Sequence, residues 1–122
     1  MEKLVIDRSR WLRGMGFGTL LASAEFKKSH SNVDIKVGDM CCLGFYCKQR
    51  GIPEVDLLDR GMPRSLESSE LTNSLPSWLL QKGFTSSRLA EANDIQRYTA
   101  SEREAEIKWL FAQEGVEVEF VG

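Results

Sequence analysis

The chain has 122 residues, 42% of them hydrophobic and 28% charged, a balance typical of one globular domain and too apolar for a disordered segment. The formal net charge of -2 argues against a general nucleic-acid-binding protein, which needs a basic surface. Apolar runs fall far short of the roughly 20 residues of a membrane span, and charges interrupt the opening segment. We therefore expect a single cytoplasmic domain over residues 1–122, with no membrane anchor and no signal peptide.

The first part of the chain predicts strands and a brief helix around a glycine-rich stretch. Leu4–Ile6 is a β-type run, and a short helix that carries Trp11 is expected to end at Gly14. Glycines then alternate with apolar residues over Gly14–Gly18, which predicts an irregular segment. The alternation of apolar and charged residues over 33–37 predicts a further strand within an otherwise polar loop or hairpin.

A central helix is predicted over residues 40–50. Asp39 can cap its start, and Gly51 follows its end. Met40, Leu43 and Cys47 share one face, and further apolar residues cover much of the rest. Because a helix that is apolar nearly all round is a buried one, we expect this helix to lie at the centre of the fold.

The second half of the chain predicts short helices, one longer helix and a final strand. Short helical turns are expected near Glu54–Leu58 and Ser77–Leu80, and another helix from Thr85 or Ser86 to about Asn93-Asp94. Thr99 and Glu102 form a capping box that opens a helix ending near Glu114. The strict alternation that follows, over Val116–Phe120, is typical of a half-buried strand.

These elements predict a single α+β domain. Its buried central helix would pack on a small, mostly antiparallel sheet, and a C-terminal helix would precede the last strand. The terminal segments Leu4–Ile6 and Val116–Val121 are both expected to join that sheet.

The three cysteines lie in one short segment, as Cys41, Cys42 and Cys47. Zinc needs four convergent ligands, but Cys41 and Cys42 point about 100° apart on a helix, and the single histidine, His30, lies in a polar loop. We therefore expect free, buried thiols with no metal and no other cofactor. A thiol enzyme stays open as an alternative, because Cys41 or Cys42 in a first helical turn would have a lowered pKa.

Arg10, Arg13, Asn93, Asp94 and Trp109 are the candidate binding residues. Arg10 and Arg13, expected on one helix face, could meet a phosphate or an acidic protein patch, or lie in water. Asn93 and Asp94 occupy a helix end, where a structural turn or a ligand-contacting pair would fit. Trp109 lies off the apolar stripe of its helix, so it is either covered by another element or part of an interface.

The segment Cys41–Cys47, with its pattern CCLG-x-x-C, resembles a loose family of small proteins encoded by bacteriophages and prophages. Further elements of that resemblance are Trp11–Gly14, Leu75-Pro76 with Trp78, Leu89 with Asn93-Asp94, the helix over Arg103–Phe111 and the ending over Gly115–Val121. The resemblance implies a phage-type accessory protein. By analogy, such proteins are often directed at host processes, including antiviral defence.

Taken together, these observations favour a non-catalytic accessory protein that binds and modulates a host protein, for example by inhibiting a defence component. Two alternatives stay open. One is a protein that sequesters a nucleotide-like signal near Arg8–Gly18 and Asn93-Asp94, and the other is the thiol enzyme. A ligand binder should show a concave arginine-lined pocket, whereas a protein inhibitor should show an exposed apolar patch. The partner's identity and the existence of a homo-oligomer are not determined by the sequence.

Overall fold

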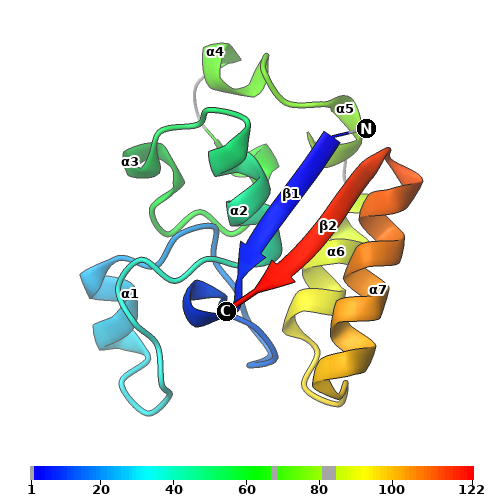
Figure 1. Ribbon diagram of the computed structural model, residues 1–122. Coiled ribbons are helices and arrows are strands. Elements are labelled where there is room, and N and C mark those ends of the chain that lie inside the picture. Colours follow the sequence, from blue (N-terminus) through cyan, green and yellow to red (C-terminus); the bar gives the residue numbers. More distant parts are fainter. Residues whose placement is uncertain (1, 67–68, 81–84) are drawn as a thin grey trace.

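A computed structural model describes residues 2–66, 69–80 and 85–122 (Figure 1). Helices and strands are mixed along the chain, which confirms the predicted α+β class. In chain order the elements are β1 (Glu2–Asp7), the 3-10 helix η1 (Arg8–Arg10), α1 (Ala24–Ser29), α2 (Cys42–Gln49), α3 (Glu54–Leu57), the 3-10 helix η2 (Pro63–Ser65), α4 (Ser69–Thr72), α5 (Ser77–Leu80), α6 (Thr85–Asp94), α7 (Ala100–Gln113) and β2 (Val116–Val121). Within these ranges no helix is long and apolar enough to cross a membrane.

The two strands from opposite ends of the chain pair with each other, as predicted. They run parallel, in a register that aligns Glu2 with Val116 and Asp7 with Val121. The prediction of a mostly antiparallel sheet is therefore wrong for the part of the chain that is described. Alternation of apolar residues identifies the buried face of a strand, but it contains no information about strand direction. Here α7 and the turn at Gly115 set the direction of β2.

One face of this sheet is buried by helices, and the other faces solvent. Figure 1 shows α2 behind β1, and α6 and α7 side by side next to β2. The inward side chains are aliphatic or aromatic and almost fully buried: Leu4, Ile6, Val116, Val118 and Phe120. On the outer face, Lys3 and Glu119 form an ion pair of 2.9 Å. The alternating sequence of β2 thus forms a half-buried strand, as predicted.

The central helix α2 is buried, as its all-round apolar composition predicts. Its side chains Leu43, Tyr46 and Cys47 are at most 1% exposed. Gly44 lies directly against the backbone of Leu20, so a β-carbon at this position would clash with that backbone. The helix starts later than predicted, with Cys41 at the N-cap. The Asp39 carboxylate does not cap it and instead accepts a hydrogen bond from the Lys36 backbone N–H at 2.9 Å.

Three local predictions in the first third are wrong. The early helix is only the 3-10 turn η1, and Trp11 follows it in extended conformation. Residues 33–37 form no strand, because Ile35 packs into a small second core with Leu12 and Ala22 while Val37 stays exposed. The segment before them contains α1, which was expected to be loop or hairpin.

The elements predicted for the second half of the chain are present in the structure. The helices near 54–58, 77–80 and 85–94 are present as α3, α5 and α6. The capping box of α7 is complete, because the Thr99 hydroxyl accepts from the Glu102 N–H and the Glu102 carboxylate accepts from the Thr99 N–H. This well-specified helix brings Arg103 to the interior and Trp109 to the surface.

Candidate functional site

Asn93 is the centre of a buried hydrogen-bond network. Its side chain is fully buried at the end of α6. The amide oxygen accepts from the Trp11 indole N–H at 2.8 Å and from the Cys42 backbone N–H at 3.0 Å. The amide nitrogen donates to the Leu12 carbonyl at 2.9 Å and to the Asp94 carboxylate at 3.0 Å. Asn93 thus caps the first turn of α2 from a distant helix, and these bonds use its donors and acceptor.

Arg103 of α7 caps the end of α6 in turn. Its guanidinium donates to the carbonyls of Ala92 and Ile95, both at 2.7 Å, and also to those of Asn93 and Tyr98. A buried arginine is normally paired with a carboxylate, but here the partners are the carbonyls that a helix end leaves unpaired.

The glycine-rich stretch is packed against this same helix end. The backbone N–H groups of Gly14 and Gly16 donate to the carbonyls of Asn93 and Asp94, at 2.8 and 2.7 Å. Both glycines have positive φ, the conformation that lets the chain follow the helix end. The stretch is therefore a tight packing element, and its N–H groups at these two positions are unavailable to a phosphate.

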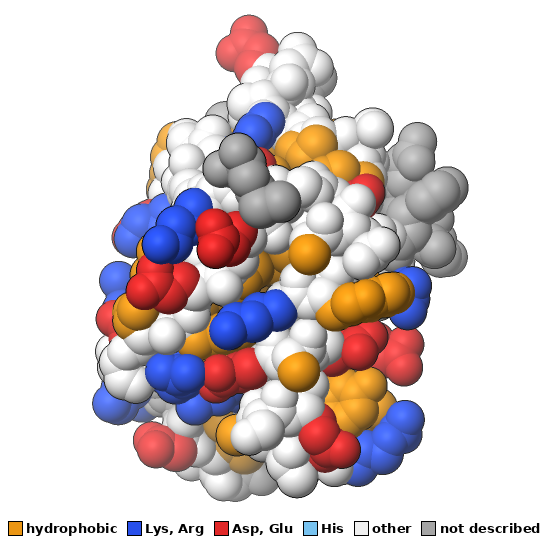
Figure 2. All heavy atoms as spheres, turned by 45° about the vertical axis from the view of Figure 1, so that its right-hand side comes forward, with side chains coloured by type: hydrophobic (Ala, Val, Ile, Leu, Met, Phe, Trp, Pro, Cys, Tyr) orange, Lys and Arg blue, Asp and Glu red, His pale blue; other side chains and the backbone are white. Residues whose placement is uncertain are grey.

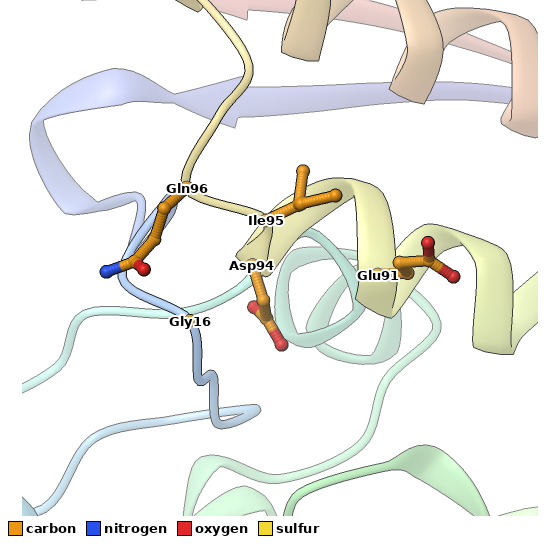
Figure 3. Close-up of a pocket in the computed structure, with 5 residues that line it drawn as sticks. All are labelled: Gly16, Glu91, Asp94, Ile95 and Gln96. Atoms are coloured by element: carbon orange, nitrogen blue, oxygen red, sulfur yellow. The ribbon is translucent and has the colours of Figure 1, made fainter.

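Asp94 borders an open hollow of about 430 Å³. Figure 3 shows Glu91 and Asp94 projecting from α6, with Gly16 and Gln96 at the other side of the hollow. Burial raises the pKa of the Asp94 carboxyl, although the hydrogen bond from Asn93 and the charge of Arg103 oppose this shift. The predicted binding residues Asn93 and Asp94 therefore have different surroundings. Asn93 is fully buried, whereas Asp94 lines a surface hollow.

A second hollow, of about 270 Å³, is lined by Arg8, Arg13 and Lys36, and both arginines already have partners within the fold. Arg8 donates to both carboxylate oxygens of Glu104 at 2.8 Å. Arg13 stacks on the Trp11 ring at 4.5 Å and donates to the carbonyls of Arg8 and Trp11. The same hollow contains the carboxylates of Asp34 and Asp39, which would repel an anionic ligand.

Arg10 points to a different place from Arg13, contrary to the prediction that they share a helix face. It is exposed and donates to the Gly38 carbonyl at 3.0 Å. Gly38 lines a third hollow, of about 300 Å³, which is mainly apolar. Val37, Val55 and Leu58 also line it, with exposed fractions of 59%, 74% and 39%. Sequence analysis missed these residues, although Val55 between Glu54 and Asp56 already was an apolar side chain in a polar setting.

Trp109 is half exposed on the outer side of α7. The Arg88 guanidinium of α6 lies over its ring at 5.5 Å. The described residues therefore leave half of Trp109 uncovered, and its membership of an interface stays a prediction. Figure 2 shows acidic, basic and hydrophobic side chains interspersed over α7 and β2, with no large area of one kind.

The three thiols are buried and unbridged, as predicted. Burial raises the pKa of Cys41 and of Cys47 to about 12, and it raises the pKa of Cys42 as well. These thiols are therefore protonated at neutral pH, whereas a nucleophile or metal ligand must be a thiolate. In the described ranges, no group of three or more histidine, cysteine or acidic residues is arranged to hold a metal ion.

Comparison of the chain with family models, curated proteins and solved structures finds no match.

Proposed function

We propose that this chain is a non-catalytic accessory protein that binds a protein of its host cell through the apolar hollow at Val37, Val55 and Leu58. One observation carries the proposal. Of the five large hydrophobic side chains exposed among the described residues, three line this single hollow. Scattered exposed hydrophobic residues are ordinary, but such a cluster is a feature of interaction surfaces.

The surroundings of the hollow support a protein as the partner. Its rim is polar, with Glu54 paired to Lys48 at 2.9 Å and with Arg10 held on the Gly38 carbonyl. An apolar centre with a polar rim that contains arginine is the usual composition of a protein interface. A partner's aliphatic side chain would bury Val55 and displace water from the hollow.

The part of this proposal that names a host protein as the partner comes from the resemblance to phage and prophage proteins around Cys41–Cys47. A phage-type protein that binds without catalysis acts by occupying a surface of its target. Inhibition of an antiviral defence component is the activity that we propose on this basis.

The two alternatives receive less support. A nucleotide-like ligand needs free cationic donors, but Arg8 and Arg13 in the basic hollow are engaged by Glu104 and by backbone carbonyls. A thiol enzyme needs an accessible thiolate, but Cys41 and Cys42 are buried with raised pKa values.

The proposal is tested by Val55→Asp, which places a charge in the hollow. Tagged wild-type and variant proteins are used to capture partners from bacterial lysate, and the captured protein is then purified and titrated. We expect Val55→Asp to weaken its binding by about 2 kcal/mol or more, because the variant must bury a charge in an apolar contact. Val5→Asp is the matched control, since Val5 is also an exposed valine, on the outer face of the sheet.

Both variants should keep the wild-type circular dichroism spectrum, because both side chains are exposed. If Val5→Asp and Val55→Asp bind the purified partner equally well, the hollow is not the interface. If sedimentation instead shows wild-type dimers that Val55→Asp dissociates, the hollow binds a second copy and the host-protein proposal is wrong. A protective effect on phage plating, measured with and without a bacterial defence system, tests the anti-defence activity.

A further inference from the structure

The strand β2 has one edge that no other described strand covers. Among the described residues the sheet consists of β1 and β2 alone, so β2 is paired on one side only. In a strand of a parallel pair, the backbone N–H and C=O groups of alternate residues point to opposite sides. Alternate residues of Val116–Val121 therefore direct these groups away from β1, and no hydrogen bond from a described residue outside the sheet reaches them.

The backbone of β1 is more fully used. The Gln49 side chain of α2 donates to the Lys3 carbonyl at 2.7 Å, whereas no described side chain bonds to the backbone of β2. Unpaired N–H and C=O groups in a row are the template on which a further strand can form. The free edge of β2 is therefore the place where this sheet can be extended.

A hollow of about 330 Å³ lies beside this edge. It is lined by Lys108 and Ala112 of α7 and by residues 116–118 of β2. Figure 1 shows β2 between β1 and α7, which places the hollow on the side of β2 that is directed away from β1. Lys108 and Ala112 are both exposed, so α7 forms one wall of the hollow and leaves space next to the strand.

The outer face of the sheet is negatively charged at this edge. Glu117 and Glu119 both project from that face of β2. Lys3 of β1 lies opposite Glu117 in the register and forms its ion pair with Glu119 at 2.9 Å. One lysine thus faces two carboxylates here, and a basic side chain on an added strand would complement the remaining charge.

A second copy of β2 does not fit this edge. Side chains on the same face of an antiparallel pair lie directly opposite each other. The two antiparallel registers with the greatest overlap of β2 with itself place Glu117 opposite Glu119, or Glu119 opposite Glu119. Like charges in these positions are destabilising, so the charge of the edge favours a different chain.

We infer that the free edge of β2 binds an extended segment of a protein partner in which basic and apolar residues alternate. The backbone of that segment continues the sheet as a further strand. Its basic side chains face Glu117 and Glu119, and its apolar side chains enter the hollow beside Ala112. The inference is independent of the proposed function, because this hollow shares no lining residue with the apolar hollow at Val55.

The probe is a capped synthetic peptide with the sequence Lys-Val-Lys-Val-Lys, titrated into the full chain with NMR detection of the backbone amides. We expect the largest signal shifts in β2 and in the last turns of α7, and an affinity that falls with salt. A fully N-methylated form of the peptide keeps every charge and side chain but has no backbone donors. It should bind at least about tenfold more weakly, because the hydrogen bonds of strand addition are lost.

Ala112→Lys tests the position of the site on the protein. The longer side chain occupies the hollow and repels the peptide, so we expect an affinity about tenfold lower. Ala100→Lys is the matched control, because it makes the same substitution at an exposed position at the other end of α7 and should bind like wild type. Circular dichroism establishes that both variants are folded.

Three results would overturn the inference. They are equal binding of the two peptides, which would reduce the interaction to charge attraction, equal binding by the two variants, and an absence of measurable binding at low salt. Val55→Asp should bind the peptide like wild type. Failure at the edge of β2 therefore leaves the apolar hollow as a separate question, and failure at the apolar hollow leaves the edge as one.

Discussion

Two regions on the same pair of helices use their polar and aromatic side chains in opposite ways. Around Asn93, the side chains of Trp11 and Arg103 are buried and their hydrogen-bonding groups are paired. A few residues further along α7, Trp109 is half exposed, and Arg88 lies over its ring. Both regions contain residues that sequence analysis identified as binding candidates, and only their surroundings distinguish them.

The difference shows that an unusual residue indicates function only where its bonding capacity remains free. Asn93 already makes four side-chain hydrogen bonds with described residues, so it has nothing left to offer a ligand. The half-exposed ring of Trp109 has apolar area that only a partner could bury. We therefore treat Asn93 as a structural residue and Trp109 as an interaction residue, and three substitutions test this division.

The largest effect is expected for Asn93→Ala. The substitution leaves the Trp11 indole N–H, the Cys42 backbone N–H and the Leu12 carbonyl without their buried partner. At about 1–3 kcal/mol for an unsatisfied buried group, partly relieved by relaxation, we expect a loss of about 3–5 kcal/mol in the free energy of unfolding. Urea denaturation followed by circular dichroism measures it.

Asn32→Ala is the control, because Asn32 is exposed in the turn after α1 and should tolerate the change within about 0.5 kcal/mol. A stable Asn93→Ala protein that melts like wild type would show that the network is dispensable. Asn93 would then be open again to a functional role.

Arg103→Met should have an intermediate effect. Methionine keeps the apolar stem within the core but removes the donors to Ala92, Ile95 and the neighbouring carbonyls at the end of α6. We expect a loss of about 2–3 kcal/mol in unfolding free energy, the usual value for hydrogen bonds from a charged group. Hydrogen exchange should also quicken at the Gly14 and Gly16 amides, which bond to the same helix end.

The control for this variant is Arg97→Met, because Arg97 is exposed in the connection between α6 and α7. Equal stabilities of the two variants would mean that the carbonyl caps contribute nothing measurable. In that case the buried charge of Arg103 would require another explanation.

The sequence predicted those features that local patterns encode. The capping box of Thr99 and Glu102 located α7 correctly, and alternation located β2. The uniform apolar coverage of α2 predicted its central place. Each of these signals depends on residues only a few positions apart, where periodicity and capping chemistry act directly.

Features that depend on contacts between distant parts of the sequence could not be predicted from such local patterns. The parallel pairing of the strands follows from how α7 returns the chain, and the late start of α2 follows from Asn93, which caps the Cys42 N–H from 51 residues away. Gly44, in the CCLG segment, is explained by the backbone of Leu20. The CCLG segment and the later Asn93 are also joined directly in the core, because the Cys42 backbone N–H donates to the Asn93 amide oxygen.

The candidate site was predicted in part. Trp109 was identified by its position off the apolar stripe, and it is exposed. The apolar hollow was not predicted, because Val37 and Val55 come from segments that only the fold brings together. An isolated valine in a polar loop is too common in sequences to indicate an interface.

Trp109→Ala should have the smallest effect on folding, although tryptophan is the largest side chain. Half of its surface already faces water, so the truncation removes only the buried half of the side chain and the stacking of Arg88. We expect unfolding free energy to fall by about 1–2 kcal/mol, since about half of the apolar area of a core tryptophan is lost together with an exposed cation–π pair. Truncation of a core tryptophan would instead cost about 3–5 kcal/mol. Urea denaturation beside Arg103→Met, on the same helix, separates these cases, and a loss as large as that of Arg103→Met would place Trp109 in the core. A small loss would show that Trp109 contributes little to the core, so that its exposed ring on the outer side of α7 is free to contact a partner.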